Sequence, residues 1–347
     1  MSRKICIIGH FGEGKNLLNG QTVKTKNITE ELQKQLGQDQ VLKIDTHGGL
    51  KNIIKAPFQV LYALKNSQNV MIFPAHNGLR IYAPLLSFFR PFFKGRKLHY
   101  NVIGGWLAEF ISNKKFLCKA LKKFDSICVE TNAMKYALAH QGFFKNVYVT
   151  PNCKKLTAVS QNELVYNAHT PYKLCTFSRV MKEKGIEDAV NAVTISNESL
   201  GYTAFSLDIY GQIDSDQTEW FDDLQKRFPA YIIYKGMVPF DKSVETLKNY
   251  FALLFPSYYA GEGFAGTLID AFSSGVPVIS SNWKYNTEIV NDKVGYIHEA
   301  RDQKALAELL NEIANNPSMI EEKKKACLIE SEKYRIDRVV GMLVDLL

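Results

Sequence analysis

The stretch Pro256–Glu288, PSYYAGEGFAGTLIDAFSSGVPVISSNWKYNTE, decides the fold. An apolar run ends just before it at Phe255, and the loop that follows has glycines at 261, 263 and 266. A helical segment then starts near Thr267, and a second apolar run covers Val276–Ile279. This order predicts a strand, a glycine-rich loop, a helix and a second strand. The first amides of such a helix, together with its dipole, favour an anion beyond the strand ends.

Two acidic residues lie in the same stretch. Glu262 is in the loop and Asp270 is in the first helical turn, with seven residues between them. A phosphate at the helix start, beside carboxylates that can grip hydroxyls, is the arrangement that a sugar nucleotide would need. The sequence therefore predicts an anion site with two carboxylates here.

Short apolar runs alternate with helical patterns in both directions from this stretch. The runs before it are 4–9, 41–44, 70–73, 98–103, 126–129, 147–149, 172–177, 205–210, 231–234 and 252–255. Strands that alternate with helices predict parallel sheets covered on both faces. The chain of 347 residues suits two such domains, and a polar stretch at 160–170 reads as the linker between them. We therefore expect an α/β fold with two doubly wound halves and a site in the cleft between them.

Charge and cysteine usage indicate a compartment and a class of partner. Residues 1–168 hold 24 Lys and Arg against 9 Asp and Glu, whereas the remainder is acidic. A basic first half predicts an anionic partner: a membrane surface, a nucleic acid or a phosphorylated substrate. The six cysteines form no C-x-x-C pair, which favours buried free thiols in a reducing cytosol. No signal peptide or membrane-spanning run is visible, so we expect a cytoplasmic protein.

The segment 80–123 combines basic and aromatic residues. It holds ten Lys and Arg, one acid (Glu109) and seven Phe or Trp residues. This mixture suits the headgroup region of an anionic membrane, which would attach the protein peripherally to the inner face of the plasma membrane. Single-stranded nucleic acid, or a core helix with a solvated basic face, would also account for it.

A basic loop opens the second half. Arg179 and Lys184 belong to the sequence SRVMKEKG (178–185), which follows the run 172–177, and flank a loop that leads into the next helix. A guanidinium fork and an ammonium point charge could hold a diphosphate from two sides. Gly20 closes a glycine-containing loop after the first strand, where the backbone could approach a ligand closely.

The order of motifs in the second half resembles family 4 glycosyltransferases of the GT-B fold. These motifs are S-R-x4-K-G at 178–185, IYGQI at 209–213, YKGMV at 234–238 and PS-x4-EGF-x5-D-A-x2-SG-x-PVI-x8-EIV at 256–290. In the first half, GGWL (104–107) and VET-x2-MK (129–135) resemble bacterial members that build capsular polysaccharide or exopolysaccharide.

The resemblance implies two domains and a set of roles. Residues 1–168 would bind the acceptor, residues 169–332 would bind the donor, and a last helix, 333–347, would cross back to the first domain. Arg179 and Lys184 match the diphosphate-binding pair, and Glu262 matches the acid that contacts the donor sugar. The rest of the donor site would be the ribose contact Asp270, the nucleobase contacts Gly236, Met237 and Val238, the loop glycine Gly20, and the backbone of Gly263, Phe264, Ala265, Gly266, Thr267 and Leu268.

This sequence departs from the family pattern at two positions. Asp270 stands where a Glu is usual, and Gly104-Gly105 occupies about the place of a first-domain histidine. His10 and His76 are candidates to replace that histidine, although an ordinary loop histidine explains each of them.

The implied reaction is a retaining sugar transfer from a nucleoside diphosphate sugar, a UDP-sugar, to a saccharide or a polyprenyl-diphosphate-linked acceptor. Arg179, Lys184 and the helix amides would stabilise the leaving diphosphate, so that no metal or other cofactor is needed. Asp214-Ser215-Asp216 resembles the D-x-D motif of metal-dependent transferases, but Asp and Ser are also ordinary turn residues.

Two other functions remain open at this stage. A sugar-nucleotide 2-epimerase shares the two-domain fold and would form product without an acceptor. A non-catalytic GT-B subunit could partner an active transferase. Nucleic-acid binding leaves the motifs of the second half unexplained, so we expect no nucleic-acid partner.

Overall fold

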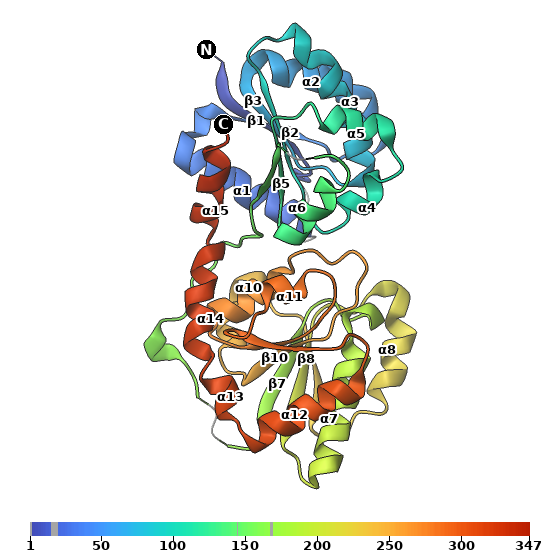
Figure 1. Cartoon of the computed structure of the whole chain (residues 1–347), viewed down its shortest axis with the longest axis vertical. Coiled ribbons are helices and arrows are strands. Elements are labelled where there is room, and N and C mark those ends of the chain that lie inside the picture. The colour runs from blue at the N-terminus through green and yellow to red at the C-terminus, as the bar shows by residue number, and fades with distance from the viewer. Residues whose placement is uncertain (1, 15–19, 144, 167–168) are drawn as a thin grey trace. The chain divides into compact units, whose positions relative to one another are not determined.

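The computed structural model describes residues 2–14, 20–143, 145–166 and 169–347 (Figure 1). The chain divides into two compact units, each with its own parallel sheet. The first unit contains Met1–Lys155 and Arg335–Leu347, and the second contains Leu156–Tyr334.

The first unit has a six-stranded parallel sheet, among its described residues, in the order β2-β1-β3-β4-β5-β6. The strands are β1 (Arg3–Gly9), β2 (Val41–Asp45), β3 (Ser67–Ile72), β4 (Lys97–Asn101), β5 (Ser126–Val129) and β6 (Val147–Val149). The helices are α1 (Gly20–Leu36), α2 (Leu50–Asn66), α3 (His76–Phe89), α4 (Leu107–Ile111), α5 (Lys115–Leu121), α6 (Asn132–Ala139) and α15 (Ile336–Val344), with short 3-10 turns η1 (Gln38–Gln40) and η2 (Arg90–Phe92).

Helices cover both faces of this sheet, which explains the continuous apolar run of its central strand β1. Ile5, Ile7 and Ile8 on β1 are all fully buried, as in a parallel sheet with no solvent face. On one face, α1 and α15 pack together over β1 and β3, and α2, α3 and α5 lie on the other face (Figure 1).

The second unit repeats this architecture with the strand order β12-β11-β10-β7-β8-β9 in the described part of the chain. Its strands are β7 (Tyr172–Phe177), β8 (Phe205–Tyr210), β9 (Ile232–Gly236), β10 (Ala252–Phe255), β11 (Val278–Ser281) and β12 (Gly295–His298). Its helices are α7 (Ile186–Leu200), α8 (Thr218–Gln225), α9 (Ser243–Leu247), α10 (Gly266–Ser273), α11 (Asn286–Ile289), α12 (Gln303–Asn315), α13 (Ser318–Glu321) and α14 (Lys324–Ser331), with 3-10 turns η3 (Gln161–Glu163), η4 (Lys182–Lys184), η5 (Ser215–Gln217), η6 (Phe240–Lys242) and η7 (Glu332–Tyr334).

Two details differ from the sequence-based expectation. The edge strand β12 was not predicted, because its four residues GYIH are neither continuously apolar nor long enough to alternate clearly. The units divide after Lys155 rather than after residue 168. Residues beyond 155 attach to the second unit, because Leu156 packs on its core and Val159 N–H donates to the Ser273 carbonyl at 2.9 Å. The last helix α15 starts at Ile336 and belongs to the first unit.

The cysteines and the helices can be compared with the free thiols and the lack of a membrane-spanning run expected from the sequence. All six cysteines are free thiols; five are buried and Cys118 is half-buried, as predicted. Within the described residues, no helix is both long enough and apolar enough to cross a membrane.

Candidate functional site

The basic loop after β7 is pressed against the loop after β10. Gly185, which follows Lys184, has φ 71°, and a Cβ there would lie 2.2 Å from the Pro256 carbonyl oxygen. Only glycine fits this left-handed conformation and close approach. The K-G pair of the motif therefore brings Lys184 beside the loop that carries Glu262.

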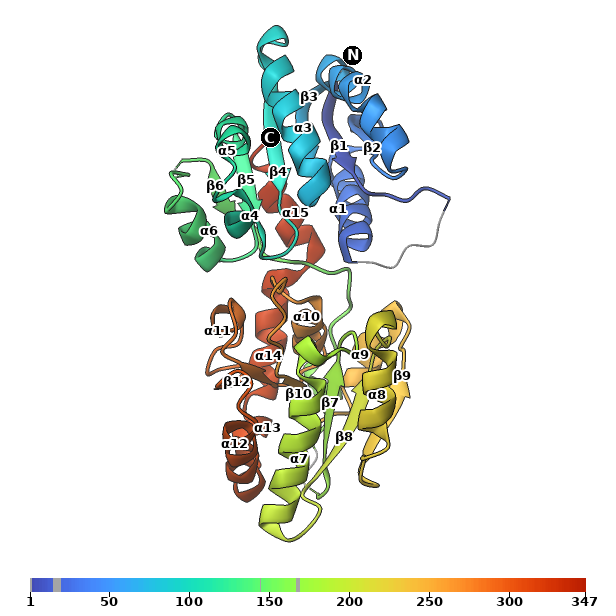
Figure 2. The same cartoon turned by 90° about the vertical axis from the view of Figure 1, so that its right-hand side faces the viewer.

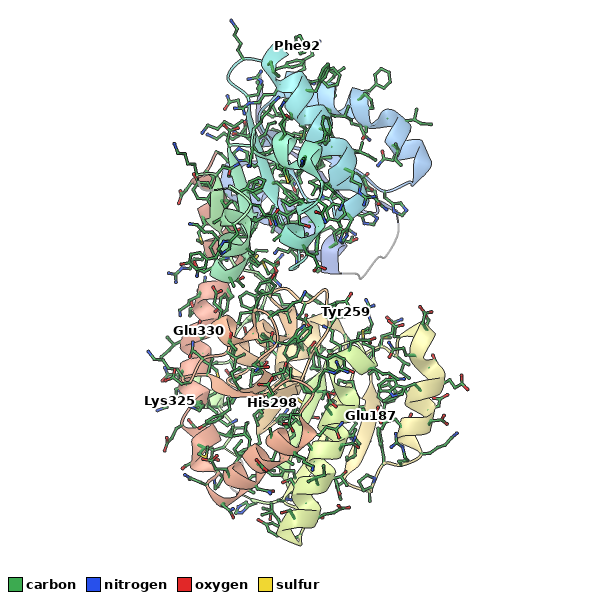
Figure 3. All side chains as sticks on the ribbon, turned by 45° about the vertical axis from the view of Figure 1, so that its right-hand side comes forward. Phe92, Glu187, Tyr259, His298, Lys325 and Glu330 are labelled. Atoms are coloured by element: carbon green, nitrogen blue, oxygen red, sulfur yellow. The ribbon has the colours of Figure 1, made fainter. Side chains whose placement is uncertain are left out.

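Lys184 and Glu262 form an ion pair. The Lys184 Nζ atom lies 2.6 Å from Glu262 Oε2, and both side chains are largely buried. The same carboxylate oxygen accepts a hydrogen bond from Ser257 Oγ, also at 2.6 Å. The ammonium further lies 5.0 Å from the ring centroid of Tyr259, whose position in this loop is labelled in Figure 3. Two donors thus fix one oxygen of Glu262, and the other oxygen, Oε1, receives neither of these two bonds.

A buried chain of small polar side chains supports this carboxylate. Ser257 is fully buried, and its carbonyl accepts a hydrogen bond from Ser281 Oγ at 2.5 Å. Asn286 Nδ2 donates in turn to Ser281 Oγ at 3.4 Å. These hydrogen bonds connect the loop after β10 with β11 and α11, so the orientation of Glu262 depends on all three elements.

Arg179 pairs with Asp214, the first acid of the triplet that resembles a D-x-D motif. Its Nη1 atom lies 3.2 Å from Asp214 Oδ2. Asp214 also caps η5, since its side chain accepts from Asp216 N–H at 3.2 Å. Asp214 therefore orients a cation and closes a turn. In the part of the chain that the structure describes, no group of three or more His, Cys, Asp or Glu residues could hold a metal ion.

A cavity of about 260 Å³ opens at the carboxyl ends of β7, β8 and β9. Gly211 makes it possible for β8 to approach β7 here, because its φ is 140° and a Cβ would lie 1.7 Å from the Ser178 carbonyl oxygen. The cavity brings together four residues predicted from sequence, Met237, Val238, Thr267 and Asp270, with Phe177, Ser178, Tyr210, Gly211 and Gln212.

Asp270 and Thr267 hold the wall of this cavity on α10. Asp270 is almost fully buried, and its Oδ1 accepts from Ser243 Oγ at 2.9 Å. The Thr267 hydroxyl donates to the Phe177 carbonyl at 2.6 Å and joins α10 to the end of β7. Asp270, whose side chain is shorter than the usual Glu, is thus held in the cavity wall by Ser243. Gly236, with φ 76°, ends β9 immediately before Met237.

At the start of α10, one of the predicted backbone donors already has an acceptor. The side chains of Phe264 and Leu268 are buried in the core, so only backbone atoms of these residues could face a ligand. The Leu268 N–H already donates to the Ala265 carbonyl at 3.1 Å, which makes it a poorer phosphate donor than expected. Ala265 precedes the helix without a side-chain cap, and the first amides of Gly266 and Thr267 have no acceptor within the helix. Gly263, between Glu262 and Phe264, belongs to the same loop.

In the first unit, Gly20 is the first residue of α1 and is exposed; its predicted role is untested, and residues 15–19 of its loop lie outside the described residues. His10 and His76, the two candidates for a missing histidine, both line a cavity of about 520 Å³ in this unit.

Each of these histidines is held by neighbours. His10 Nδ1 lies 2.7 Å from Thr22 Oγ1, and its Nε2 lies 3.0 Å from His47 Nδ1. Burial, followed by the neighbouring His47, lowers the pKa of His10. His76 stacks on Trp106, with ring centroids 3.9 Å apart. Burial, followed by the cations Arg80 and Lys114, lowers the pKa of His76. Both shifts favour the neutral imidazole over the charged form.

The sequence did not indicate several of these partners. Ser257, Ser281 and His47 are short or isolated polar residues whose role depends on folding across the sheet edge. The P-S dipeptide before the loop was the one signal that could have singled out Ser257.

Comparisons with known proteins match the second unit to a protein family. Residues 165–333 match the family described as Glycosyl transferases group 1. They form a group 1 glycosyltransferase domain. The chain is 29% identical over 184 residues to the UDP-N-acetylglucosamine–peptide N-acetylglucosaminyltransferase GtfA subunit of Streptococcus gordonii, covering 50% of this chain and 34% of that protein. It is 28% identical over 148 residues to the capsular polysaccharide biosynthesis glycosyltransferase CapM of Staphylococcus aureus, covering 41% of this chain and 37% of that protein. The matches thus span little more than a third of either relative.

Solved structures establish the fold as GT-B. Sucrose-phosphate synthase from Thermosynechococcus elongatus has a TM-score of 0.75 at 14% identity, with 99% of this chain and 98% of that chain covered. HepE of Anabaena in complex with UDP has a TM-score of 0.75 at 13% identity, with the same coverage. The fold predicted from the sequence motifs is therefore confirmed.

Proposed function

We propose that this protein is a retaining glycosyltransferase that moves a sugar from a nucleoside diphosphate sugar, a UDP-sugar, to a saccharide or a lipid-linked acceptor in surface polysaccharide assembly. The observation that carries the proposal is the Lys184–Glu262 pair in the same unit as the cavity walled by Asp270. A cation for phosphate, a carboxylate for sugar hydroxyls and a second carboxylate beside a base-sized cavity are the groups that such a donor requires.

The comparisons support the choice of donor and acceptor class. The HepE structure contains UDP, the GtfA subunit is named for transfer from UDP-N-acetylglucosamine, and CapM is named for capsular polysaccharide biosynthesis. We assign the nucleobase to the cavity at Met237 and Val238, the ribose to Asp270, and the diphosphate to Arg179, Lys184 and the start of α10.

The two ion pairs define how the site would work. Cleavage of the sugar–phosphate bond leaves negative charge on the diphosphate, and Lys184 and Arg179 stabilise that charge best if they are already oriented. Glu262 and Asp214 hold these cations in the absence of a donor, so a diphosphate has to compete with or share each carboxylate partner. Glu262 can meanwhile accept hydrogen bonds from the sugar through Oε1. The acceptor hydroxyl would attack on the same face that the phosphate leaves, and its proton would pass to the departing phosphate. The reaction so described needs no metal ion.

A thermal-shift screen followed by a transfer assay tests this function. We expect UDP to raise the melting temperature more than GDP or dTDP does. A ligand at about 100 times its Kd adds about 2.7 kcal/mol of stability, so binding of the preferred nucleotide gives a measurable shift. With a UDP-sugar and an acceptor, the protein should release UDP at a rate that EDTA does not change. Conversion of the UDP-sugar without any acceptor would identify an epimerase instead. No shift with any nucleotide would favour a non-catalytic subunit.

A further inference from the structure

The first unit exposes a stripe of large apolar side chains along α2. Ile54 and Phe58 are each 74% exposed, and Ile53 and Tyr62 are 44% and 52% exposed. Ile54, Phe58 and Tyr62 follow one another at intervals of four residues and so lie on one side of the helix, with Ile53 beside them, over a length of about 14 Å at 1.5 Å per residue. A helix packed on a sheet usually turns its polar side to solvent, so this side of α2 is suited to a second apolar environment.

The end of α3 and the turn η2 extend this stripe. Phe88 and Phe92 are 65% and 74% exposed, and their rings lie 6.3 Å apart. The loop after η2 is joined to the last turn of α2, because Arg96 Nε donates to the Leu64 carbonyl at 3.0 Å. Figure 2 shows α2 and α3 next to each other in the first unit, and Figure 3 labels Phe92 at the tip of that unit. These six side chains are called the α2 surface below.

The chain segment that carries the α2 surface has charge of one sign. The sequence contains no Asp or Glu between Asp45 and Glu109, whereas it contains eight Lys and Arg over those positions. Lys55 and Lys65 on α2 and Lys94 after η2 are exposed. Long cationic side chains beside apolar ones suit a surface with an apolar interior and anionic headgroups.

The segment 80–123 contributes less to this surface than the sequence suggested. Trp106 and Phe110 are half-buried and pack with His76. Arg90 bonds to Asp125 at 2.9 Å, and Lys97 bonds to the Leu347 carbonyl. Much of its basic and aromatic content thus stabilises the first unit, and α2, outside the segment, supplies the larger apolar area.

We infer that the α2 surface binds an anionic lipid bilayer. Ile53 also lines the 520 Å³ cavity of this unit, beside Asn52 and Ile81, so the bilayer would lie next to the cavity mouth. Resting on the proposed function, this placement indicates an acceptor that is anchored in the bilayer and enters the cavity from its edge. The aliphatic Ile53 and Ile54 do not serve base stacking, which argues against nucleic acid as the occupant.

Vesicle co-sedimentation tests the bilayer. The wild-type protein should bind vesicles of phosphatidylcholine mixed with phosphatidylglycerol, and it should bind phosphatidylcholine alone much less. The variant Ile54→Ser/Phe58→Ser should bind at least about tenfold more weakly, because it removes two side chains from the apolar interior. Lys55→Glu/Lys65→Glu should weaken binding and reduce its dependence on salt.

Two matched controls locate the effect. Phe116 on α5 is 75% exposed and Ile329 on α14 is 65% exposed, and both lie outside the α2 surface. Phe116→Ser and Ile329→Ser should bind vesicles as the wild type does. The inference is overturned if the wild type ignores anionic vesicles, if Phe116→Ser loses as much binding as the α2 variant, or if the α2 variant only abolishes self-association.

The donor site provides an independent readout. The α2 variant should keep the UDP-induced thermal shift and transfer to a water-soluble acceptor, and it should lose transfer to an acceptor embedded in vesicles. If UDP does not raise the melting temperature of the wild type, the proposed function is contradicted. Vesicle binding by the α2 surface is then judged by the co-sedimentation results alone.

Discussion

The Ser257 hydroxyl should matter for catalysis although it lies beneath the site. Ser257→Ala removes one of the two donors that hold Glu262 Oε2, each at 2.6 Å. A hydrogen bond to a charged group contributes about 1.5–3 kcal/mol. We therefore expect the unfolding free energy to fall by about that amount, because only the Lys184 bond of the two then remains on the buried Glu262 Oε2.

The effect on transfer follows from orientation. Without the Ser257 bond, Glu262 can turn toward Lys184 and draw the ammonium away from the diphosphate. A loss of about 1.4 kcal/mol of transition-state stabilisation lowers kcat tenfold, so a drop of at least about tenfold is expected.

Ser280→Ala is the matched control. Ser280 is equally buried on the neighbouring strand, and its hydroxyl donates to the Phe255 carbonyl at 3.3 Å and not to a carboxylate. Urea unfolding and sugar transfer should be measured for both variants. Equal kcat values for Ser257→Ala and Ser280→Ala would refute the proposed role of this hydrogen bond.

Three further changes test separate parts of the account. Lys184→Ala should reduce transfer by more than about tenfold and also destabilise the protein by about 3 kcal/mol, since it leaves Glu262 without its cation; unchanged transfer would contradict the donor assignment. Asp214→Asn should weaken UDP binding, because Arg179 loses the partner that orients it, and transfer should stay insensitive to EDTA. A change in metal requirement would contradict the assignment of Asp214 to the Arg179 ion pair. Burial lowers the pKa of Lys324 to about 8, so Lys324→Met should raise the unfolding free energy at pH 7 by about 2–3 kcal/mol. The folded state binds fewer protons than the unfolded state between pH 8 and 10, so this advantage should shrink as the pH rises; a constant difference would show that the charge is not its cause.

The sequence predicts those parts of the fold that rest on local pattern. A buried parallel strand tends to be a continuous apolar run, and all eleven expected runs overlap strands β1–β11. The strand β12 was missed because edge strands are short and mixed in polarity. The sequence placed the domain boundary after residue 168 because the polar stretch 160–170 resembles a linker, whereas the second unit starts at Leu156, which packs into its core.

The site was predictable as a set of residues but not as a set of pairs. Glycine, acid and base motifs identified Lys184, Glu262 and Asp270, because each motif is local. Their partners come from distant positions: Glu262 is 78 residues from Lys184, and Arg179 is 35 residues from Asp214. Sequence spacing carries no information about such contacts. The exposed side of α2 was equally inaccessible, since an amphipathic pattern does not reveal which side remains uncovered.

Calorimetric titration with UDP and with uridine, in buffer that contains EDTA, tests the central claim most directly. If the diphosphate is held by Arg179, Lys184 and the start of α10, UDP should bind at least about tenfold more tightly than uridine, because charge-assisted hydrogen bonds are the stronger kind. In the Lys184→Ala variant, the affinity for UDP should exceed the affinity for uridine by a smaller factor. Equal affinities of the wild type for UDP and uridine, or no binding of either, would contradict the account.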